Sequence, residues 1–132
     1  MNPVLIDTSV WIDFFNGIVN SKTEIVKEYL EMEYPLFICP IILQEVLQGI
    51  REDENYLKVK SNMLNLEILI IDHIESATGA ADLYRDLRKK GVTIKKSNDC
   101  IIGFYAMSFG IHLVHRDRDF NLIAEKTNLK IM

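Results

Sequence analysis

The stretch that decides the fold of this chain is residues 4–11, Val-Leu-Ile-Asp-Thr-Ser-Val-Trp. A short apolar run of strand type ends at Asp7. The Asp7 carboxylate and the hydroxyls of Thr8 and Ser9 are groups that can cap the start of a helix. The helix that begins there carries Trp11 and Phe15 and ends at Gly17. This segment therefore predicts a buried strand that passes directly into a helix.

The same change from a strand pattern to a helix pattern recurs along the chain. Further short strands are expected at 36–39, 67–71, 111–115 and 129–131. Further helices are expected from 21, where Ser21 and Glu24 form a capping box, and at 41–51, 52–66, 75–90, 97–110 and 120–126. Short strands that alternate with longer helices predict an α/β fold, a parallel sheet of four to five strands sandwiched by helices in three α/β/α layers.

Length and composition predict one domain, residues 1–132, of which 48% are hydrophobic and can form a sizeable core. No apolar run approaches the roughly 18 residues of a membrane-spanning helix, and no signal peptide precedes Asp7. We therefore expect a cytoplasmic protein with no membrane contact. The two cysteines, Cys39 and Cys100, are expected in the core, because neither they nor the three histidines have the spacing of a disulfide framework or a zinc site.

Five acidic residues are expected near the carboxyl ends of the strands, where ligands gather in such sheets. They are Asp7, Glu45, Asp99, Asp117 and Asp119. Each alone is explained as a helix cap, a first-turn acid, a turn residue or exposed helix surface. Several lie within apolar sequence, however, and carboxylates pressed together near a core repel one another unless a cation compensates them. Oxygen ligands without cysteine or histidine favour Mg²⁺ or Mn²⁺, and Mg²⁺ points toward phosphoryl chemistry.

Four motifs in these regions resemble the PIN-domain ribonucleases of the VapC type, which are toxins of type II toxin–antitoxin systems. The motifs are residues 5–11 (LIDTSVW), 43–49 (LQEVLQG), 90–94 with 98–102 (KGVTI and NDCII) and 116–120 (RDRDF). Their order and spacing make the resemblance specific, and it runs from end to end. It implies that the expected three-layer sheet is PIN-like and Rossmann-like. It implies that Asp7, Glu45, Asp99 and Asp117 are catalytic, and that Asp7, Asp99, Asp117 and Asp119 hold the metal.

The resemblance also implies an activity and partners. One or two metal ions would activate a water for in-line attack on phosphorus and leave 5′-phosphate and 3′-hydroxyl ends on the RNA substrate. A cognate antitoxin protein and a homodimer are implied as well. Thr8, Ser9 and Asn98 would contact and orient the acidic groups. Relatives often carry threonine or serine at the position of His115, which is expected to be a buried strand residue or else a phosphate contact or acid–base group.

RNA binding needs positive charge, although the formal net charge of the chain is −4. Residues 1–84 carry 5 basic and 14 acidic groups, whereas residues 85–132 carry 10 and 5, so −9 and +5 add to −4. The basic surplus therefore lies in the part of the chain that contains three of the five acidic residues. The expected RNA contacts are Lys95, Lys96, Arg116 and Arg118.

Other functions fit parts of the pattern. A haloacid-dehalogenase-like phosphatase needs a second aspartate where this chain has Ser9, and a receiver domain with Asp72 as phosphoacceptor lacks its strand-one acidic pair. A third alternative is a PIN-like protein-binding module with a vestigial metal site and an aromatic surface, although packing against the sheet explains the same aromatic residues better. These are Trp11, Phe14, Phe15, Tyr29 and Tyr56.

Overall fold

The computed structural model of the chain contains one five-stranded sheet in the order β3-β2-β1-β4-β5, in which every neighbouring pair is parallel. The strands are β1 (Val4–Ile6), β2 (Leu36–Ile38), β3 (Glu67–Ile68), β4 (His112–Val114) and β5 (Lys130–Ile131). The helices are α1 (Thr8–Phe15), α2 (Ser21–Glu31), α3 (Pro40–Gln48), α4 (Asp53–Leu64), α5 (His73–Lys89), α6 (Ser97–Phe109) and α7 (Arg118–Lys126). The predicted α/β class and parallel sheet are confirmed, with five strands.

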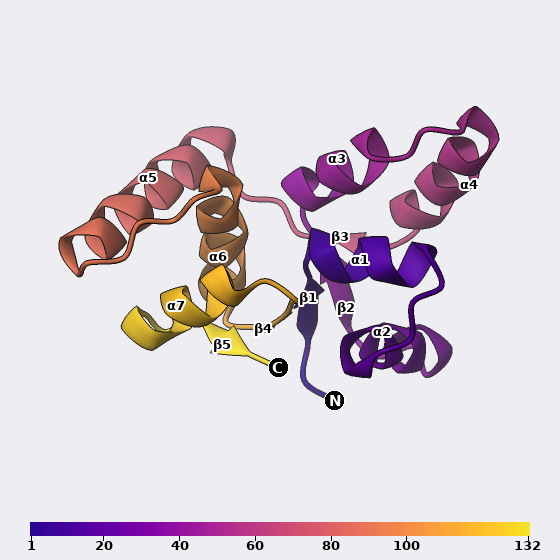
Figure 1. The fold of residues 1–132 in the computed structure, drawn as a ribbon, viewed down its shortest axis with the longest axis horizontal. Coiled ribbons are helices and arrows are strands. Elements are labelled where there is room, and N and C mark those ends of the chain that lie inside the picture. Colours follow the sequence, from indigo (N-terminus) through magenta and orange to yellow (C-terminus); the bar gives the residue numbers. More distant parts are fainter.

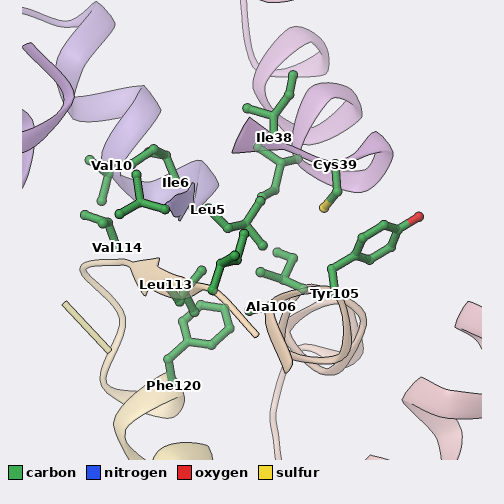
Figure 2. Packing of buried hydrophobic residues seen from close by; sticks show 14 of the residues in the cluster. Leu5, Ile6, Val10, Ile38, Cys39, Tyr105, Ala106, Leu113, Val114 and Phe120 are labelled. Carbon is green, nitrogen blue, oxygen red and sulfur yellow. The ribbon is translucent and has the colours of Figure 1, made fainter. Parts of the chain in front are cut away.

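Helices cover both faces of the sheet. Figure 1 shows α5, α6 and α7 on one side of β1 and α1 and α2 on the other. Leu5 pairs with Leu113 and Ile6 with Val114, so successive residues of β1 and β4 point to opposite layers. In Figure 2, Val114 and Ile6 lie beside Val10 of α1, whereas Leu113 lies beside Phe120 of α7.

This double coverage explains why β1 has no polar face. Val4, Leu5 and Ile6 are all 0% exposed, and a strand buried on both sides is a continuous apolar run. Cys39 and Cys100 are buried in the same core, as predicted. Trp11 and Tyr29 are buried too, which supports packing over a surface role for these two aromatic residues.

Several element boundaries differ from those expected. The capping box of α2 lies one residue earlier than predicted: the Asn20 side chain accepts hydrogen bonds from the Lys22 and Thr23 amides, and the Thr23 hydroxyl accepts one from the Asn20 amide. Ser21 and Glu24 therefore do not form the predicted box, because asparagine at position 20 already supplies a strong N-cap.

The edge strand β3 is shorter than the predicted range 67–71. Its pairing with β2 ends at Ile68, after which the Leu69 amide donates to the Ile38 carbonyl and the chain leaves the sheet toward α5. That helix begins at His73 rather than at Glu75, because the Asp72 side chain caps it by accepting from two backbone amides.

Candidate metal centre

Three carboxylates converge at the carboxyl edge of the sheet. Asp99 lies in the first turn of α6, Asp117 is the N-cap of α7, and Asp119 lies in the first turn of α7. Each offers an oxygen, and these three oxygens lie within 4.8 Å of one another. The parallel sheet explains this, because Asp117 and Asp119 follow β4, while Asp99 opens α6, the helix that leads back into β4 and therefore begins at the same edge.

Asp7 lies beside this cluster at the end of β1. Its amide donates to the Val114 carbonyl at 2.9 Å, and its Oδ2 accepts from the Ser9 hydroxyl at 2.6 Å and the Ser9 amide at 3.0 Å. Asp7, Glu45 and Asp99 line one cavity of about 240 Å³. Burial raises the pKa of Asp7 above its usual range, and the nearby Glu45 charge adds to this, although the Ser9 hydrogen bonds oppose it.

Glu45, on α3, is held by two different elements. The Thr8 hydroxyl donates to its Oε1 at 2.7 Å, and the Asn98 side-chain amide donates to its Oε2 at 3.2 Å. Both carboxylate oxygens are therefore oriented by neighbours from α1 and α6. The structure brings Thr8, Ser9 and Asn98 into contact with acidic side chains.

Lys96 supplies positive charge at the cluster. Its ammonium lies 2.7 Å from Asp117 Oδ2. Burial raises the pKa of Asp117, but the Lys96 hydrogen bond and the Asp119 amide outweigh it, so this pKa lies below its ordinary value. The same hydrogen bond raises the pKa of Lys96, which therefore stays protonated.

Asp99 forms no ion pair of its own. Burial raises its pKa to about 7; Lys96 opposes the rise, whereas the charges of Asp7, Asp117 and Asp119 add to it. Its Oδ2 is buried and has no hydrogen-bond partner. An orphaned carboxylate oxygen among three other acids is what a cation would satisfy, so these residues fit a hard divalent metal ion.

A relay from α1 to the loop after β4 supports Asp7. The Arg116 amide donates to the Ser9 hydroxyl oxygen at 3.1 Å, and that hydroxyl donates to Asp7. The Arg116 side chain forms an ion pair with Asp13, a buried residue of α1. Sequence reasoning missed Asp13, although a lone carboxylate within the apolar run Val-Trp-Ile-Asp-Phe-Phe at 10–15 was the available signal.

The four expected RNA contacts differ in whether they are paired within the chain. Lys95 and Arg118 are exposed and form no ion pair, whereas Lys96 pairs with Asp117 and Arg116 with Asp13. Two of the four cations are therefore engaged within the chain itself.

His115 directly follows β4 and is 5% exposed. Its Nδ1 accepts from the Asp117 amide at 3.0 Å, and its ring packs against Phe120 with the centroids 5.2 Å apart. Burial, together with the Lys22 charge, lowers its pKa. His115 is thus a neutral ring that shapes the loop carrying Asp117.

The fold and the site together define a three-layer α/β/α protein with a carboxylate cluster at the carboxyl edge of its parallel sheet. The family model described as the PIN domain matches residues 4–126. Ribonuclease VapC11 of Mycobacterium tuberculosis and VapC ribonuclease Mb1587 of Mycobacterium bovis are each 34% identical to this chain over 128 residues, which is 96% of either chain. The chain belongs to the PIN-domain family and, within it, to the VapC group.

Solved structures show the same fold. VapBC2 from Rickettsia felis, crystallised with a DNA fragment from its promoter, matches with a TM-score of 0.76 and 21% identity over 98% of this chain and 96% of that chain. DNA-bound VapBC from Salmonella typhimurium matches with a TM-score of 0.72 and 19% identity over 100% and 98%. Membership of this family excludes the two alternatives of a haloacid-dehalogenase-like phosphatase and a receiver domain. The helices of this fold are too short or too polar for any of them to traverse a bilayer.

Proposed function

We propose that this protein is a metal-dependent endoribonuclease and the toxin of a toxin–antitoxin pair, and that it hydrolyses RNA to 5′-phosphate and 3′-hydroxyl ends. One observation carries the proposal: a chain of the VapC group gathers Asp99, Asp117 and Asp119 within 4.8 Å and leaves a buried oxygen of Asp99 unpaired. Nuclease chemistry of this kind needs no serine or cysteine nucleophile, because water attacks the phosphorus.

The cofactor proposed is Mg²⁺ or Mn²⁺, because all donors in the cluster are carboxylate oxygens. Asp7, Asp99, Asp117 and Asp119 would hold it. When bound, the ion supplies Lewis-acid stabilisation of charge on the phosphate and favours deprotonation of water. Glu45 lines the same cavity as Asp7 and Asp99 and would orient water, with its own position fixed by Thr8 and Asn98.

The chain's basic residues would bind the RNA strand. Lys95 and Arg118 are free to contact phosphates. The Lys96 ammonium is paired with Asp117. Once a metal ion neutralises the carboxylates, Lys96 would leave Asp117 and bind a phosphate instead. Arg116 would contribute mainly through the loop that it anchors. Replacing both Lys95 and Lys96 with alanine should weaken RNA affinity and flatten its salt dependence; an unchanged salt slope would argue against this role.

The proposed partners of this protein are those that its place in the VapC group suggests. The two mycobacterial relatives are named as ribonucleases, and the similar structures are named as VapBC complexes, which supports a cognate antitoxin partner here. We also propose a homodimer, a cytoplasmic location and a single PIN-like domain over residues 1–132. The single sheet that runs from β1 to β5 supports the last of these.

The experiment that tests the function maps 5′-phosphate ends in RNA from cells that express the wild type or Asp7→Asn. New ends should appear with the wild type and be lost in the variant. Asp82→Asn, which removes an exposed acid of α5, is the matched control and should cleave like the wild type. Cleavage by purified protein should stop in EDTA and return with Mg²⁺ or Mn²⁺. Full activity of Asp7→Asn, or activity that survives saturating EDTA, would overturn the proposal.

A further inference from the structure

A second polar cavity, of about 380 Å³, adjoins the carboxylate cluster. It lies between the N-terminus of α2, the loop after β4 and the first turn of α7. Asp117 and Arg116 line it, which joins it to the metal centre, and only one of its nine lining residues, Ile131, is hydrophobic. None of the acidic residues proposed to hold metal lies in it except Asp117.

Three of the four charged side chains that line this cavity are cationic. Arg116 is paired with Asp13, and Asp117 with Lys96. Lys22 and Arg118 also line the cavity, and neither forms an ion pair with a carboxylate side chain. The Lys22 ammonium already donates one hydrogen bond, to the main-chain oxygen of the last residue, Met132, so Arg118 is the one cation of the three without a partner inside the chain.

A neutral donor completes the set. Because the His115 Nδ1 accepts from the Asp117 amide, the neutral ring carries its proton on Nε2. That nitrogen is buried with no acceptor in hydrogen-bonding geometry, although the Asn121 side chain interacts with the His115 ring and both residues line the cavity. A buried N–H without an acceptor is unfavourable, and a ligand oxygen would remove that cost.

Two further groups point to an anion. The Ser21 hydroxyl and the Asn121 side-chain amide also line the cavity. The N-terminus of the 11-residue helix α2 adds partial positive charge. The Lys22 and Thr23 amides are already bonded to Asn20, so side chains rather than free backbone amides would bind the ligand.

We propose that this cavity binds a non-scissile phosphate of the RNA strand, next to the phosphate that is cleaved, with Lys22, Arg118, the His115 Nε2–H and Asn121 as donors. The inference rests on the proposed ribonuclease function and adds a strand-positioning site to it. A phosphodiester fits because it is a compact anion with several acceptor oxygens and continues directly to the neighbouring phosphate at the metal centre.

The test measures binding without cleavage. Fluorescence anisotropy with a labelled short single-stranded RNA, in EDTA, compares the wild type with Lys22→Ala/Arg118→Ala and with Asn121→Ala. The double variant should bind about tenfold more weakly, as expected for loss of charge-assisted hydrogen bonds. Its salt slope should fall by about 0.7, the value for one neutralised phosphate on a single strand.

The matched control is Lys27→Ala/Lys126→Ala, which removes two exposed cations from the same two helices, outside the cavity. Its RNA affinity should stay within about twofold of that of the wild type if direct contacts in the cavity, rather than the overall electrostatic field of the protein, determine binding. A panel of RNAs is then tested in which each RNA has one phosphate replaced by a neutral methylphosphonate. At one position in the strand, this replacement should weaken binding to the wild type but not to Lys22→Ala/Arg118→Ala. Equal losses in the control and the cavity variant, or no position with this behaviour, would overturn the subsite.

Failure of the subsite and failure of the function give different results. If the wild type cleaves RNA and Asp7→Asn does not, but the cavity variants bind RNA like the wild type, the subsite is wrong and the nuclease stands. If the wild type neither binds nor cleaves RNA, both fail. If a cavity variant keeps its RNA affinity but no longer co-purifies with the antitoxin, the cavity binds a protein ligand. That result would overturn the proposal that it binds an RNA phosphate.

Discussion

The Arg116 guanidinium in the loop after β4 donates two hydrogen bonds to Asp13 of α1, at 2.5 and 3.2 Å. The two groups differ in environment: the Asp13 side chain is 6% exposed and that of Arg116 57%. The pair joins the helix that follows Asp7 to the loop that carries Asp117. It therefore fixes two segments of the carboxylate cluster relative to each other.

This asymmetry predicts unequal effects of removing either partner. Arg116→Ala leaves a buried carboxylate with only the long 3.4 Å contact from Asn20, and should lower the free energy of unfolding by about 2–3 kcal/mol. Asp13→Ala leaves an arginine that water can solvate and should cost less. Chemical denaturation measures both, and the double variant should be more stable than Arg116→Ala alone. A double variant that is less stable than either single variant would contradict this account.

The contact between Thr8 and Glu45 predicts an effect on metal affinity. Thr8→Val keeps the shape of the side chain but removes the donor to Glu45 Oε1. Loss of a group that orients an acidic side chain at a metal site should weaken Mn²⁺ binding about tenfold, as measured by isothermal titration calorimetry. The control is Thr78→Val, since the exposed Thr78 hydroxyl bonds only to carbonyls of its own helix. Unchanged Mn²⁺ affinity in Thr8→Val would mean that Asn98 alone orients Glu45.

The raised pKa of Asp99 predicts a pH-dependent stability difference. The folded protein without metal keeps this proton up to about pH 7, whereas the unfolded chain releases it near 3.8. Between these values the folded state binds more protons, so the contribution of Asp99 to stability falls as pH rises. Asp99→Asn cannot titrate and therefore isolates this effect from that of His115, which both proteins retain.

The measurement is the difference in melting temperature between the wild type and Asp99→Asn, in EDTA, from about pH 5 to about pH 8. The wild type should lose stability relative to the variant across this window. Saturating Mg²⁺ should remove the trend, because the bound ion favours the ionised carboxylate. A difference that stays constant with pH in EDTA would show that Asp99 is already ionised at pH 5.

The packing of α5 on α6 predicts a steric effect at Gly79. A Cβ there would lie 2.3 Å from the Phe104 ring. Gly79→Ala should therefore lower the free energy of unfolding by about 1–2 kcal/mol, despite the roughly 1 kcal/mol that alanine adds to helix propensity. In a Phe104→Ala background the same change should be neutral or stabilising. Destabilisation of equal size in both backgrounds would rule out the clash.

Much of the fold was predictable because burial on both sides leaves a direct trace in sequence. The apolar run of β1 and the helix signals after Asp7 predict the strand-to-helix unit, and its recurrence predicts the parallel sheet. Boundaries were less predictable because neighbouring polar residues compete for the same role. Asn20 rather than Ser21 caps α2, and strand β3 ends where its partner strand ends.

The sequence by itself determined the α/β class, the resemblance to PIN-domain ribonucleases and the five acidic candidates, because apolar period, helix signals and local motifs are properties of neighbouring residues. Only the tertiary structure decided which side chains meet. The pairing of Asp13 with Arg116, the contact of Lys96 with Asp117 and the cavity lined by Lys22 and His115 join residues remote in sequence. Their proximity follows from the order of strands in the sheet, since that order sets which loops share an edge.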